Sequence, residues 1–378
     1  MRIAVDVRPL LARQISGIPE YTGRLIEALI KAHPEVEWVL FYSSWQKKPD
    51  NWLYLAGQSN VCWQQLKVPN KLINAIASLF NRPFIDRQVK ADVWLLPHFN
   101  FTPLSGRTPT ILTIHDLSFL RQPGFFSWRQ RLWHASLRLN RLVKRVDKIV
   151  AISESTERDL RELLGVPEDK IEVIYSAVGE QFKPLGKEEL LPAKDKYQLP
   201  DRFILSLATF EPRKNLAAVI EGFDSLLNRR PDLKDCQLVI AGGQGWRHGG
   251  ARAAWKKVAN RKNIKWLGYL PAADLPAVYN LASALVYPSF YEGFGLPALE
   301  AMSSGLPVIT SSVTALPEVV GSAALMIDPA DSQAISRAME QLFSDEILRK
   351  ELSLAGQKIA NKFSWQKTAE AYWQLLKR

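Results

Sequence analysis

The chain has 378 residues, of which 47% are hydrophobic and two are cysteines. This length suggests two or three domains of about 150 residues each, with enough apolar residues for sizeable cores. Cys62 and Cys236 fit neither a disulfide framework nor a cysteine metal site, which predicts a reducing, cytoplasmic compartment. The charged start, Met1 to Asp6, excludes a signal peptide, and no apolar run approaches the ~18 residues of a membrane span. We therefore expect a soluble or peripheral protein.

The formal net charge of +11 predicts an anionic partner. The densest basic segment, 121–148, contains eight Arg or Lys residues and one Asp, interleaved with Phe, Trp and Leu. This mixture is typical of a basic amphipathic helix at an anionic membrane surface. The alternative is a helix that buries Leu132, Trp133 and Leu137 in the core and exposes its arginines. We expect no nucleic-acid partner, because no helix-turn-helix, zinc-finger or RNA-binding signature occurs.

Short apolar runs that alternate with helical patterns predict an α/β protein with two Rossmann-like, doubly wound halves. Each half begins alike: a strand at 3–7 precedes a helix from about Pro19, and a strand at 203–207 precedes a helix at 215–227. Further strands are predicted at 38–42, 92–96, 110–114, 148–152, 171–175, 237–241, 264–266, 284–288, 306–310 and 324–327. We expect parallel sheets with right-handed crossovers, in two domains that face one cleft.

The predicted division places an N-terminal domain at 1–185 and a linker rich in proline and charge at 186–200. A C-terminal domain follows at 201–360, and the helix at 361–378 is expected to cross back to the N-terminal domain. In doubly wound sheets ligands bind beyond the carboxyl ends of the strands. This rule selects the candidate residues Gly17, His115, Asp116, Ser153, Arg213, Lys214, Gly243, Gly268, Tyr269 and the segment from Glu292 to Glu300.

The stretch between Glu292 and Glu300 combines two acids with a loop and a helix start. Pro297 suits the first helical position, and Gly305 suits a left-handed cap at the end of the helix. Gly293 and Gly295 leave the loop backbone unshielded, and free N–H groups at a helix start favour an anion such as a phosphate. Two acids beside an anion site suit a nucleotide-sugar. The plainer alternative is one solvated glutamate in a loop and another in the first turns of a helix.

Two motifs resemble the hallmarks of glycosyltransferase family 4, namely the segment from Phe210 to Asn215 and the segment from Ser289 to Met302. The resemblance covers nearly the whole chain and implies the GT-B fold and a retaining reaction that needs neither cofactor nor metal. No Asp-x-Asp occurs, which also disfavours a metal-dependent transferase. The segment from Thr113 to Phe119 is similar to one in transferases, mannosyltransferases among them, that build bacterial surface polysaccharides. It suggests GDP-mannose as donor and a glycan or polyprenyl-linked acceptor at the inner membrane face.

The resemblance also implies roles for individual residues. Arg213 and Lys214 match the clamp for the donor's pyrophosphate, Glu300 the acceptor for the ribose hydroxyls, and Glu292 the acid at the donor sugar. The N-terminal domain would bind the acceptor and the C-terminal domain the nucleotide-sugar. Other expected contacts are His115 with the sugar, Gly17 with the phosphate or acceptor, backbone amides of Gly293, Phe294, Gly295 and Leu296 with the diphosphate, and Gly243 and Tyr269 with the nucleotide.

Alternatives stay open on the sequence alone. Each candidate residue has a structural reading: Asp116 and Ser153 suit helix-capping groups, and His115 suits a buried strand end. A UDP- or dTDP-sugar donor, a GT-B epimerase or phosphorylase, and a basic membrane-binding protein without activity are rival functions. A nicotinamide-dependent dehydrogenase is disfavoured, because no Gly-x-Gly-x-x-Gly follows the first strand. The chain departs from the family pattern at Ser176-Ala177 and Ser311-Ser312, which puts details of the acceptor side in doubt.

Overall fold

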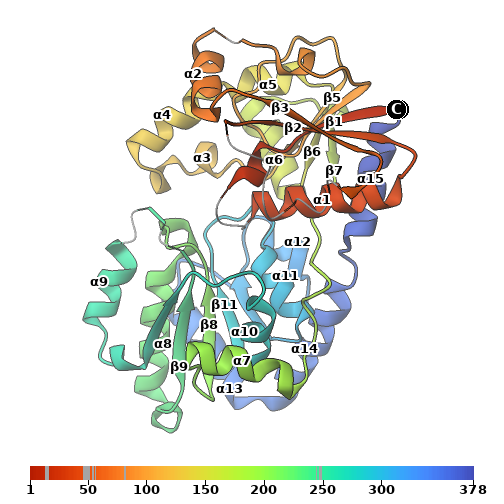
Figure 1. Ribbon diagram of the computed structural model, residues 1–378. Helices are drawn as coiled ribbons and strands as arrows, with labels where there is room; N and C mark the ends of the chain where they lie inside the picture. The colour runs from red at the N-terminus through yellow and green to blue at the C-terminus, as the bar shows by residue number, and fades with distance from the viewer. Residues whose placement is uncertain are drawn as a thin grey trace. The chain divides into compact units, whose positions relative to one another are not determined.

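The computed structural model describes residues 1–12, 17–45, 52, 55, 57–80, 82–243, 245–246 and 249–378. These residues form two compact units (Figure 1). Unit 1 comprises Met1–Pro123, Trp128–Ala177 and Ser364–Arg378, and unit 2 comprises Gly124–Ser127 and Val178–Phe363. Most of the 186–200 segment, expected as a linker, is helix α7, which packs against α10 of unit 2.

The described part of unit 1 contains a seven-stranded parallel sheet in the order β3-β2-β1-β4-β5-β6-β7. Its strands are β1 (Arg2–Asp6), β2 (Glu37–Ser43), β3 (Val61–Leu66), β4 (Val93–Leu96), β5 (Thr110–Ile114), β6 (Lys148–Ala151) and β7 (Ile171–Val173). Its helices are α1 (Ile18–Ala32), α2 (Asn70–Phe80), α3 (Ser118–Arg121), α4 (Trp128–Ser136), α5 (Leu139–Arg145), α6 (Glu154–Leu164) and α15 (Trp365–Leu376). The central strands are buried on both faces, which is why they appear in the sequence as uninterrupted apolar runs.

The described part of unit 2 contains a six-stranded parallel sheet in the order β10-β9-β8-β11-β12-β13. Its strands are β8 (Phe203–Leu207), β9 (Gln237–Ala241), β10 (Ile264–Gly268), β11 (Ala284–Tyr287), β12 (Val308–Ser311) and β13 (Leu325–Ile327). Its helices are α7 (Lys187–Tyr197), α8 (Leu216–Arg229), α9 (Gly249–Lys257), α10 (Leu275–Leu281), α11 (Leu296–Ser303), α12 (Leu316–Val320), α13 (Ser332–Ser344) and α14 (Glu346–Ala360). Helix α8 packs between α9 and α13, and Phe223 of α8 is buried in the core that they share.

The structure confirms two doubly wound α/β units with parallel sheets and all the predicted strands, with ends shifted by at most two residues. Strand β3 is missing from the prediction. It lies at the edge of its sheet, where exposed and half-buried positions alternate, so it lacks the apolar run that marks the central strands. In both sheets the strand order reverses next to the first strand, between β1 and β4 and between β8 and β11. A ligand site in a doubly wound fold is expected at such a point.

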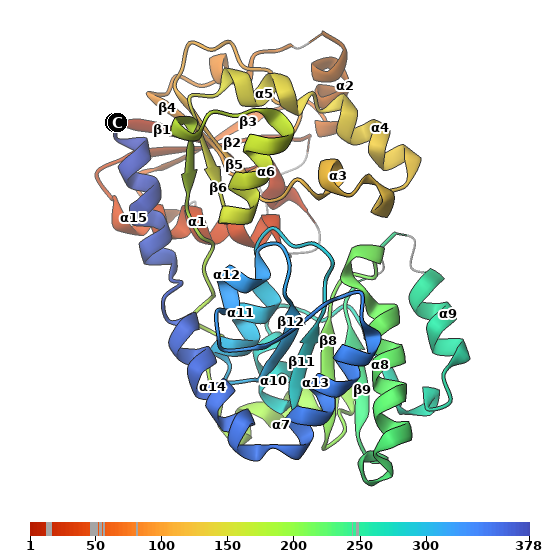
Figure 2. The same cartoon turned by 180° about the vertical axis from the view of Figure 1, so that it is seen from behind.

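The C-terminal helix α15 packs beside α1 in unit 1, as Figures 1 and 2 show. The hydroxyl of Tyr372 lies 2.7 Å from both the Tyr21 hydroxyl of α1 and the Thr113 hydroxyl of β5. All three side chains are buried. Because buried hydroxyl groups are costly without partners, this cluster fixes how α15 lies against the unit.

The basic segment 121–148 is not one continuous helix. It contains α4 and α5, which are separated at Arg138, a residue in the left-handed conformation. The alternative of a core helix is wrong for Leu132 and Trp133, which are exposed, and right for Leu137, which is buried. Phe126 also faces protein, because its ring stacks on Trp246 in unit 2.

Gly242 lies in the loop after β9, where its backbone comes close to that of Ala208 in the loop after β8. Its φ is +144°, and a Cβ atom at this position would lie 1.9 Å from the carbonyl oxygen of Ala208. The neighbouring Gly243 has no such contact within 4 Å. The two backbones therefore approach so closely that only glycine fits at position 242.

We predict that Gly242→Ala destabilises unit 2 by at least about 2 kcal/mol, through backbone strain and displacement of the Ala208 loop. Gly243→Ala is the matched control and should change stability by less than about 1 kcal/mol. Urea denaturation followed by tryptophan fluorescence measures both. Equal losses for the two variants would contradict the role given to the close approach.

Candidate functional site

The residues predicted to bind phosphate and sugar gather in unit 2 where the strand order reverses. Arg213 and Lys214 lie in a 3-10 turn after β8, Pro212–Lys214. Glu292 lies in the loop after β11, the strand that pairs with β8. The Phe290 amide donates to the Arg213 carbonyl at 2.8 Å, so the two loops are joined through their backbones.

These side chains form a buried network of ion pairs. The Lys214 Nζ atom lies 2.6 Å from one carboxylate oxygen of Glu292, and Arg213 Nη1 lies 3.4 Å from the other. Arg213 Nε donates to Glu211 at 2.8 Å. Glu211 and Glu292 are 5% and 6% exposed. Two cations and two carboxylates thus cancel in charge, which is what allows charged groups to be buried together.

Tyr287 completes this network, and the sequence analysis missed it. Its hydroxyl donates to Glu292 at 2.7 Å and accepts from Lys214 Nζ at 2.8 Å. The three polar groups therefore form a closed triangle with one defined geometry. Tyr287 occupies the end of an apolar strand, where nothing in the sequence distinguishes it from a core aromatic residue. Glu211 was missed as a site residue too, although it stands two positions before Arg213 within the recognised motif.

Burial and charge act in opposite directions on the pKa values of this network. Burial alone would raise the pKa of Glu292, but the charges of Lys214 and Arg213 outweigh it and lower the pKa to about 2. Burial, followed by the charge of Arg213, lowers the pKa of Lys214. For Glu211, burial is the largest effect and raises the pKa. Glu292 is therefore the carboxylate that stays ionised throughout the physiological range.

The glycine loop and helix α11 follow Glu292. The sequence analysis predicted Pro297 as the first residue of this helix. Helix α11 begins instead at Leu296, so Pro297 is its second residue. Gly295 caps the helix with φ +103°, and a Cβ there would lie 2.6 Å from a methyl group of Leu316. Gly305 follows the helix with φ +79°, in the left-handed conformation expected of it. The free N–H groups of α11 thus begin directly after Gly295.

Glu300 is the fifth residue of α11 and binds a different partner from Glu292. The buried hydroxyl of Tyr279 in α10 donates to its carboxylate at 2.9 Å. Tyr279 was also missed by the sequence analysis. The two glutamates that the sequence pairs by spacing therefore have different partners: Glu292 binds Lys214, Arg213 and Tyr287, and Glu300 binds Tyr279.

Gly243 and Tyr269 follow β9 and β10 in the same unit. The Gly243 carbonyl accepts from the Phe210 amide at 3.1 Å, which ties its loop to the loop that carries Arg213. Tyr269 comes after Gly268, which has φ +72°, and its side chain is 40% exposed. Both residues lie at carboxyl ends of strands, as the prediction required.

In unit 1, His115 follows β5. Its Nε2 atom lies 2.7 Å from the Pro97 carbonyl oxygen. A carbonyl can only accept, so Nε2 carries the proton and Nδ1 of the neutral ring is an acceptor. Burial is the largest effect on this imidazole and lowers its pKa. Gly17 precedes α1 with φ +52°, and nothing lies within 4 Å of the position that a Cβ would occupy.

A second histidine, His98, follows β4 beside His115 and was missed. The two ring centroids are 6.2 Å apart. Burial, then the charges of His115 and Arg8, lowers the pKa of His98 to about 3. Its buried Nδ1 atom has no hydrogen-bond partner among the described residues. Position after a predicted strand was the available signal, but a single histidine without a motif gave no reason to select it.

Asp116 and Ser153 have local structural roles, as their capping interpretations predict. One oxygen of Asp116 accepts from the amide of Ser118 at 2.9 Å and from the hydroxyl of that residue at 2.6 Å. Ser153 is the N-cap of α6 and accepts from the Thr156 amide at 3.0 Å. Asp116 is thus engaged in a turn, which leaves it poorly suited to act as a base or nucleophile.

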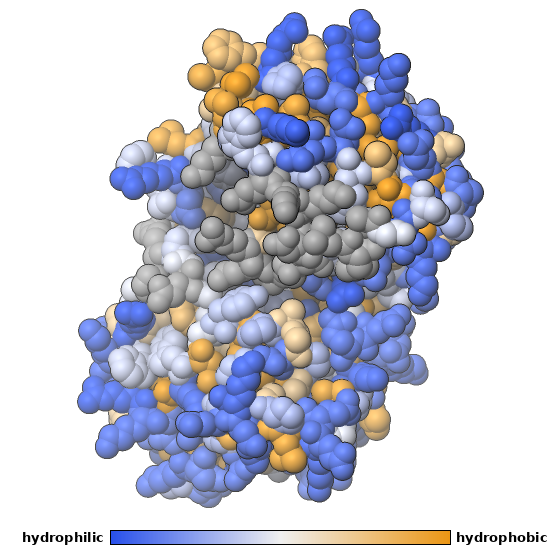
Figure 3. Space-filling view, viewed as in Figure 1, coloured by the Kyte–Doolittle hydropathy of each residue, from blue (hydrophilic) through white to orange (hydrophobic). Residues whose placement is uncertain are grey.

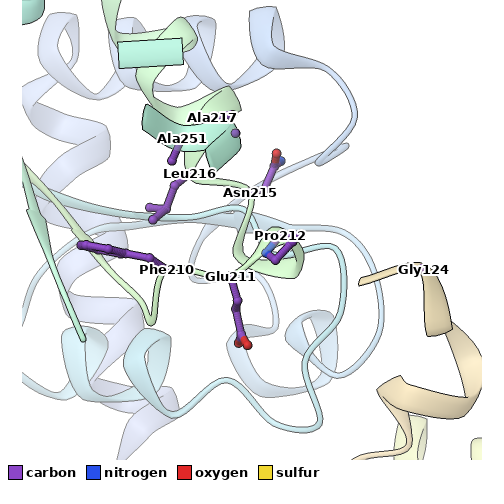
Figure 4. Close-up of a pocket in the computed structure, with 9 residues that line it drawn as sticks. Gly124, Phe210, Glu211, Pro212, Asn215, Leu216, Ala217 and Ala251 are labelled. Atoms are coloured by element: carbon purple, nitrogen blue, oxygen red, sulfur yellow. The ribbon is translucent and has the colours of Figure 1, made fainter. Parts of the chain in front are cut away.

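A pocket of about 320 Å³ is lined in part by Glu211, and Figure 4 draws the residues around it. Phe210, Pro212 and the first residues of α8 line it, together with Gly124, Gly250 and Ala251. In the figure the Glu211 side chain points away from the starts of α8 and α9. Neither Arg213 nor Lys214 lines this pocket, so it lacks the cations that a diphosphate requires. In the part of the chain that the structure describes, no group of His, Cys, Asp and Glu side chains is placed to hold a metal ion.

We predict that Glu292 makes stability fall in acid. Its pKa of about 2 in the folded protein lies below the ordinary value of 4.5, so the unfolded chain takes up the proton first as pH falls. The native protein should therefore lose stability between about pH 5 and pH 2. Glu292→Gln should show a smaller loss between pH 5 and pH 3, measured by urea denaturation. Glu351→Gln, at an exposed position of α14, is the control and should behave as the native chain does. An unchanged acid loss in Glu292→Gln would refute the ion pair's contribution.

Comparison with known proteins identifies relatives for both units. Residues 15–181 match the family described as Glycosyltransferase Family 4, and residues 188–359 match Glycosyl transferases group 1. The chain is 35% identical over 265 residues to O-antigen chain mannosyltransferase B of Escherichia coli, covering 68% of this chain and 67% of that protein. It is 39% identical over 275 residues to the serotype-specific mannosyltransferase WbdA of Escherichia coli, covering 69% of this chain and 32% of WbdA.

The fold is similar to that of solved glycosyltransferase structures. Sucrose-phosphate synthase of Thermosynechococcus elongatus superimposes with a TM-score of 0.77 at 19% identity, covering 100% of this chain and 98% of that one. At this level of identity the likeness concerns the fold. It confirms the GT-B class that the sequence analysis expected, with two parallel-sheet α/β units.

Proposed function

Because the chain belongs to glycosyltransferase family 4 and is a hexosyltransferase, we propose that it transfers mannose from GDP-mannose to a hydroxyl of a glycan or lipid-linked acceptor. The observation that supports this most strongly is the buried network of Arg213, Lys214 and Glu292 at the strand-order reversal. It sets cations for a diphosphate beside a carboxylate for sugar hydroxyls. The names of the two mannosyltransferase relatives support the choice of mannose.

The two cations would stabilise the leaving nucleotide. When the bond between the sugar's anomeric carbon and the diphosphate breaks, negative charge builds up on the diphosphate oxygens. Arg213 offers a planar fork to these oxygens and Lys214 a point charge. The amides at the start of α11 would add fixed N–H donors. Preorganised groups of this kind lower the barrier without reorganising at the moment of reaction.

Glu292 would exchange partners when the donor binds. In the structure it neutralises Lys214, and a diphosphate that binds Lys214 competes for the same cation. The sugar hydroxyls can then donate to the carboxylate, so its charge stays compensated. Glu300 would accept from the ribose hydroxyls, while Gly243 and Tyr269 lie near the nucleotide. In unit 1, the Nδ1 acceptor of His115 would bind a sugar hydroxyl.

The proposed reaction retains the configuration of the sugar. The acceptor hydroxyl attacks the anomeric carbon on the face from which GDP leaves, and its proton passes to the departing diphosphate. A double displacement would need a carboxylate on the opposite face. Asp116 is a poor candidate, because its hydrogen bonds with the amide and hydroxyl of Ser118 hold the turn at the start of α3. No metal has a step in this scheme, since Arg213 and Lys214 carry the positive charge.

We place the reaction at the cytoplasmic face of the inner membrane, with the protein associated peripherally. A polyprenyl-linked acceptor would present its glycan there, and the basic segment 121–148 suits an anionic surface. No helix in the described residues is both long enough and apolar enough to cross a bilayer.

The donor is tested by thermal unfolding with GDP, UDP, dTDP and ADP, because a ligand that binds only the folded state raises the unfolding temperature. We predict the largest rise with GDP. Incubation with GDP-mannose, excess EDTA and a lipid-linked mannan acceptor should then yield a product whose α linkage is visible by NMR. Selective stabilisation by UDP would replace the donor. Isomerisation of the donor sugar without transfer would favour the epimerase alternative.

Two substitutions separate the roles of cation and carboxylate. Lys214→Ala should weaken GDP binding and lower kcat/KM by about 10²–10³-fold, as expected when a transition-state cation is lost. Glu292→Gln should bind GDP at least as tightly as the native chain, because Lys214 loses its competitor, yet transfer mannose about 100-fold more slowly. Lys256→Ala, an exposed lysine of α9, is the control for lost positive charge. GDP affinity by calorimetry and initial rates measure both effects. Weaker GDP binding by Glu292→Gln would overturn the exchange of partners.

A further inference from the structure

Helix α2 of unit 1 has apolar side chains both on the side that packs against the core and on the side that faces solvent. Ile73 and Ala77 are buried, whereas Leu79 and Phe80 are 71% and 70% exposed. Leu72, seven residues before Leu79, is exposed on the same stripe. Residues 72–80 contain no charged side chain. A helix that faced only core and water would carry polar residues on its outer stripe.

Helix α4 differs from α2 in that it contains basic residues beside its apolar ones, and none of its residues is buried. Trp128 and Leu132, one turn apart, are 66% and 62% exposed. Helical spacing puts Arg129 on one side of this stripe and Arg131 on the other. An apolar stripe between arginines is the pattern of a helix that lies in a membrane interface, where the aromatic ring sits at headgroup level.

The segments around both helices carry net positive charge, because they contain basic residues and no acidic ones. Residues 68–85 contain two basic residues and residues 128–146 contain six, and neither segment contains Asp or Glu. Together they account for eight of the chain's net +11. Acidic residues make up about one in ten of the chain, so roughly four would be expected in 37 residues. The exposed arginines of these segments are Arg82, Arg129, Arg131, Arg138, Arg141 and Arg145.

Figures 1 and 2 draw α2 and α4 next to one another at one end of the unit 1 sheet. Figure 3 shows hydrophobic residues gathered at this end, with hydrophilic residues beside them. We propose that the outward stripes of α2 and α4 form a docking surface for an anionic lipid bilayer, with their apolar side chains among the acyl chains and their arginines at the headgroups. A second copy of the chain is a poorer occupant, because a symmetric dimer would bring two such basic surfaces together.

This surface differs from the one expected from the sequence. Segment 121–148 supplies the charge, but half of its apolar residues are buried, and Phe126 packs on Trp246. Residues 72–80 of helix α2, which carry no charge and which the sequence analysis did not select, supply the apolar side chains that insert into the bilayer. The inference rests on the proposed function only in its premise that the acceptor is lipid-linked.

The test is flotation of the full chain with vesicles of phosphatidylcholine alone or with 30% phosphatidylglycerol. We predict binding to the anionic vesicles and little to the neutral ones. Replacing Arg129, Arg131 and Arg138 by Gln should weaken binding by about fivefold per residue. Leu79→Ser with Phe80→Ser should weaken it by at least about tenfold.

The matched control is Ile347→Ser with Leu354→Ser, which removes two equally exposed apolar side chains from α14 of unit 2 and should leave binding unchanged. Equal binding to both kinds of vesicle, equal loss in the control, or a dimer in light scattering that Leu79→Ser with Phe80→Ser dissolves would each overturn the proposal. Stabilisation by GDP and transfer to a water-soluble mannan should persist in the surface variants. Vesicle binding without any transfer would leave the surface standing and refute the proposed function.

Discussion

The ion pair between Lys214 and Glu292 fixes the geometry of unit 2 at the carboxyl ends of β8 and β11. Neither charge could be buried alone at an acceptable cost, so each loop has to deliver its residue to the same place. Glu211 holds Arg213 in the same way, and Tyr287 closes the network on its strand side. The two sequence motifs, one with Arg213 and Lys214 and the other with Glu292, thus form a single ion-pair network. The charges of each motif can be buried only because the other motif neutralises them.

The fold supplies the place where these halves meet. Adjacent parallel strands whose helices lie on opposite faces leave their loops apart at the carboxyl edge, and residues from both loops can enter the gap. In unit 2 these strands are β8 and β11, and in unit 1 they are β1 and β4. Gly17 follows the first of the unit 1 strands and His98 the second. One topology, used twice, therefore explains why candidate residues from both units follow strands that are neighbours in space but distant in sequence.

Sequence reasoning predicted the architecture because buried parallel strands appear in the sequence as short apolar runs, which can be recognised by their length and by the helical patterns between them. It selected Arg213, Lys214 and Glu292 because they follow such strands, and the resemblance to glycosyltransferase family 4 supplied their expected roles. It failed for β3, whose edge position removes the apolar signal, and for Tyr287 and Tyr279, whose hydroxyls act inside elements that otherwise look like core. The outward stripe of α2 was missed for a related reason: an apolar helical pattern does not say which of its residues the core will cover.

The chain separates its positive charge into two kinds. Inside unit 2 every cation of the network faces a carboxylate, whereas the basic residues around α2 and α4 have no acidic residue in their own segments. An uncompensated pair such as Arg213 and Lys214 would bind any phosphate. With Glu292 present, a bare phosphate that takes Lys214 leaves a buried carboxylate without its cation. A nucleotide-sugar brings hydroxyl donors for that carboxylate together with its diphosphate. In the proposed reaction, the internal neutrality of the network therefore selects for a ligand that carries both sugar and phosphate.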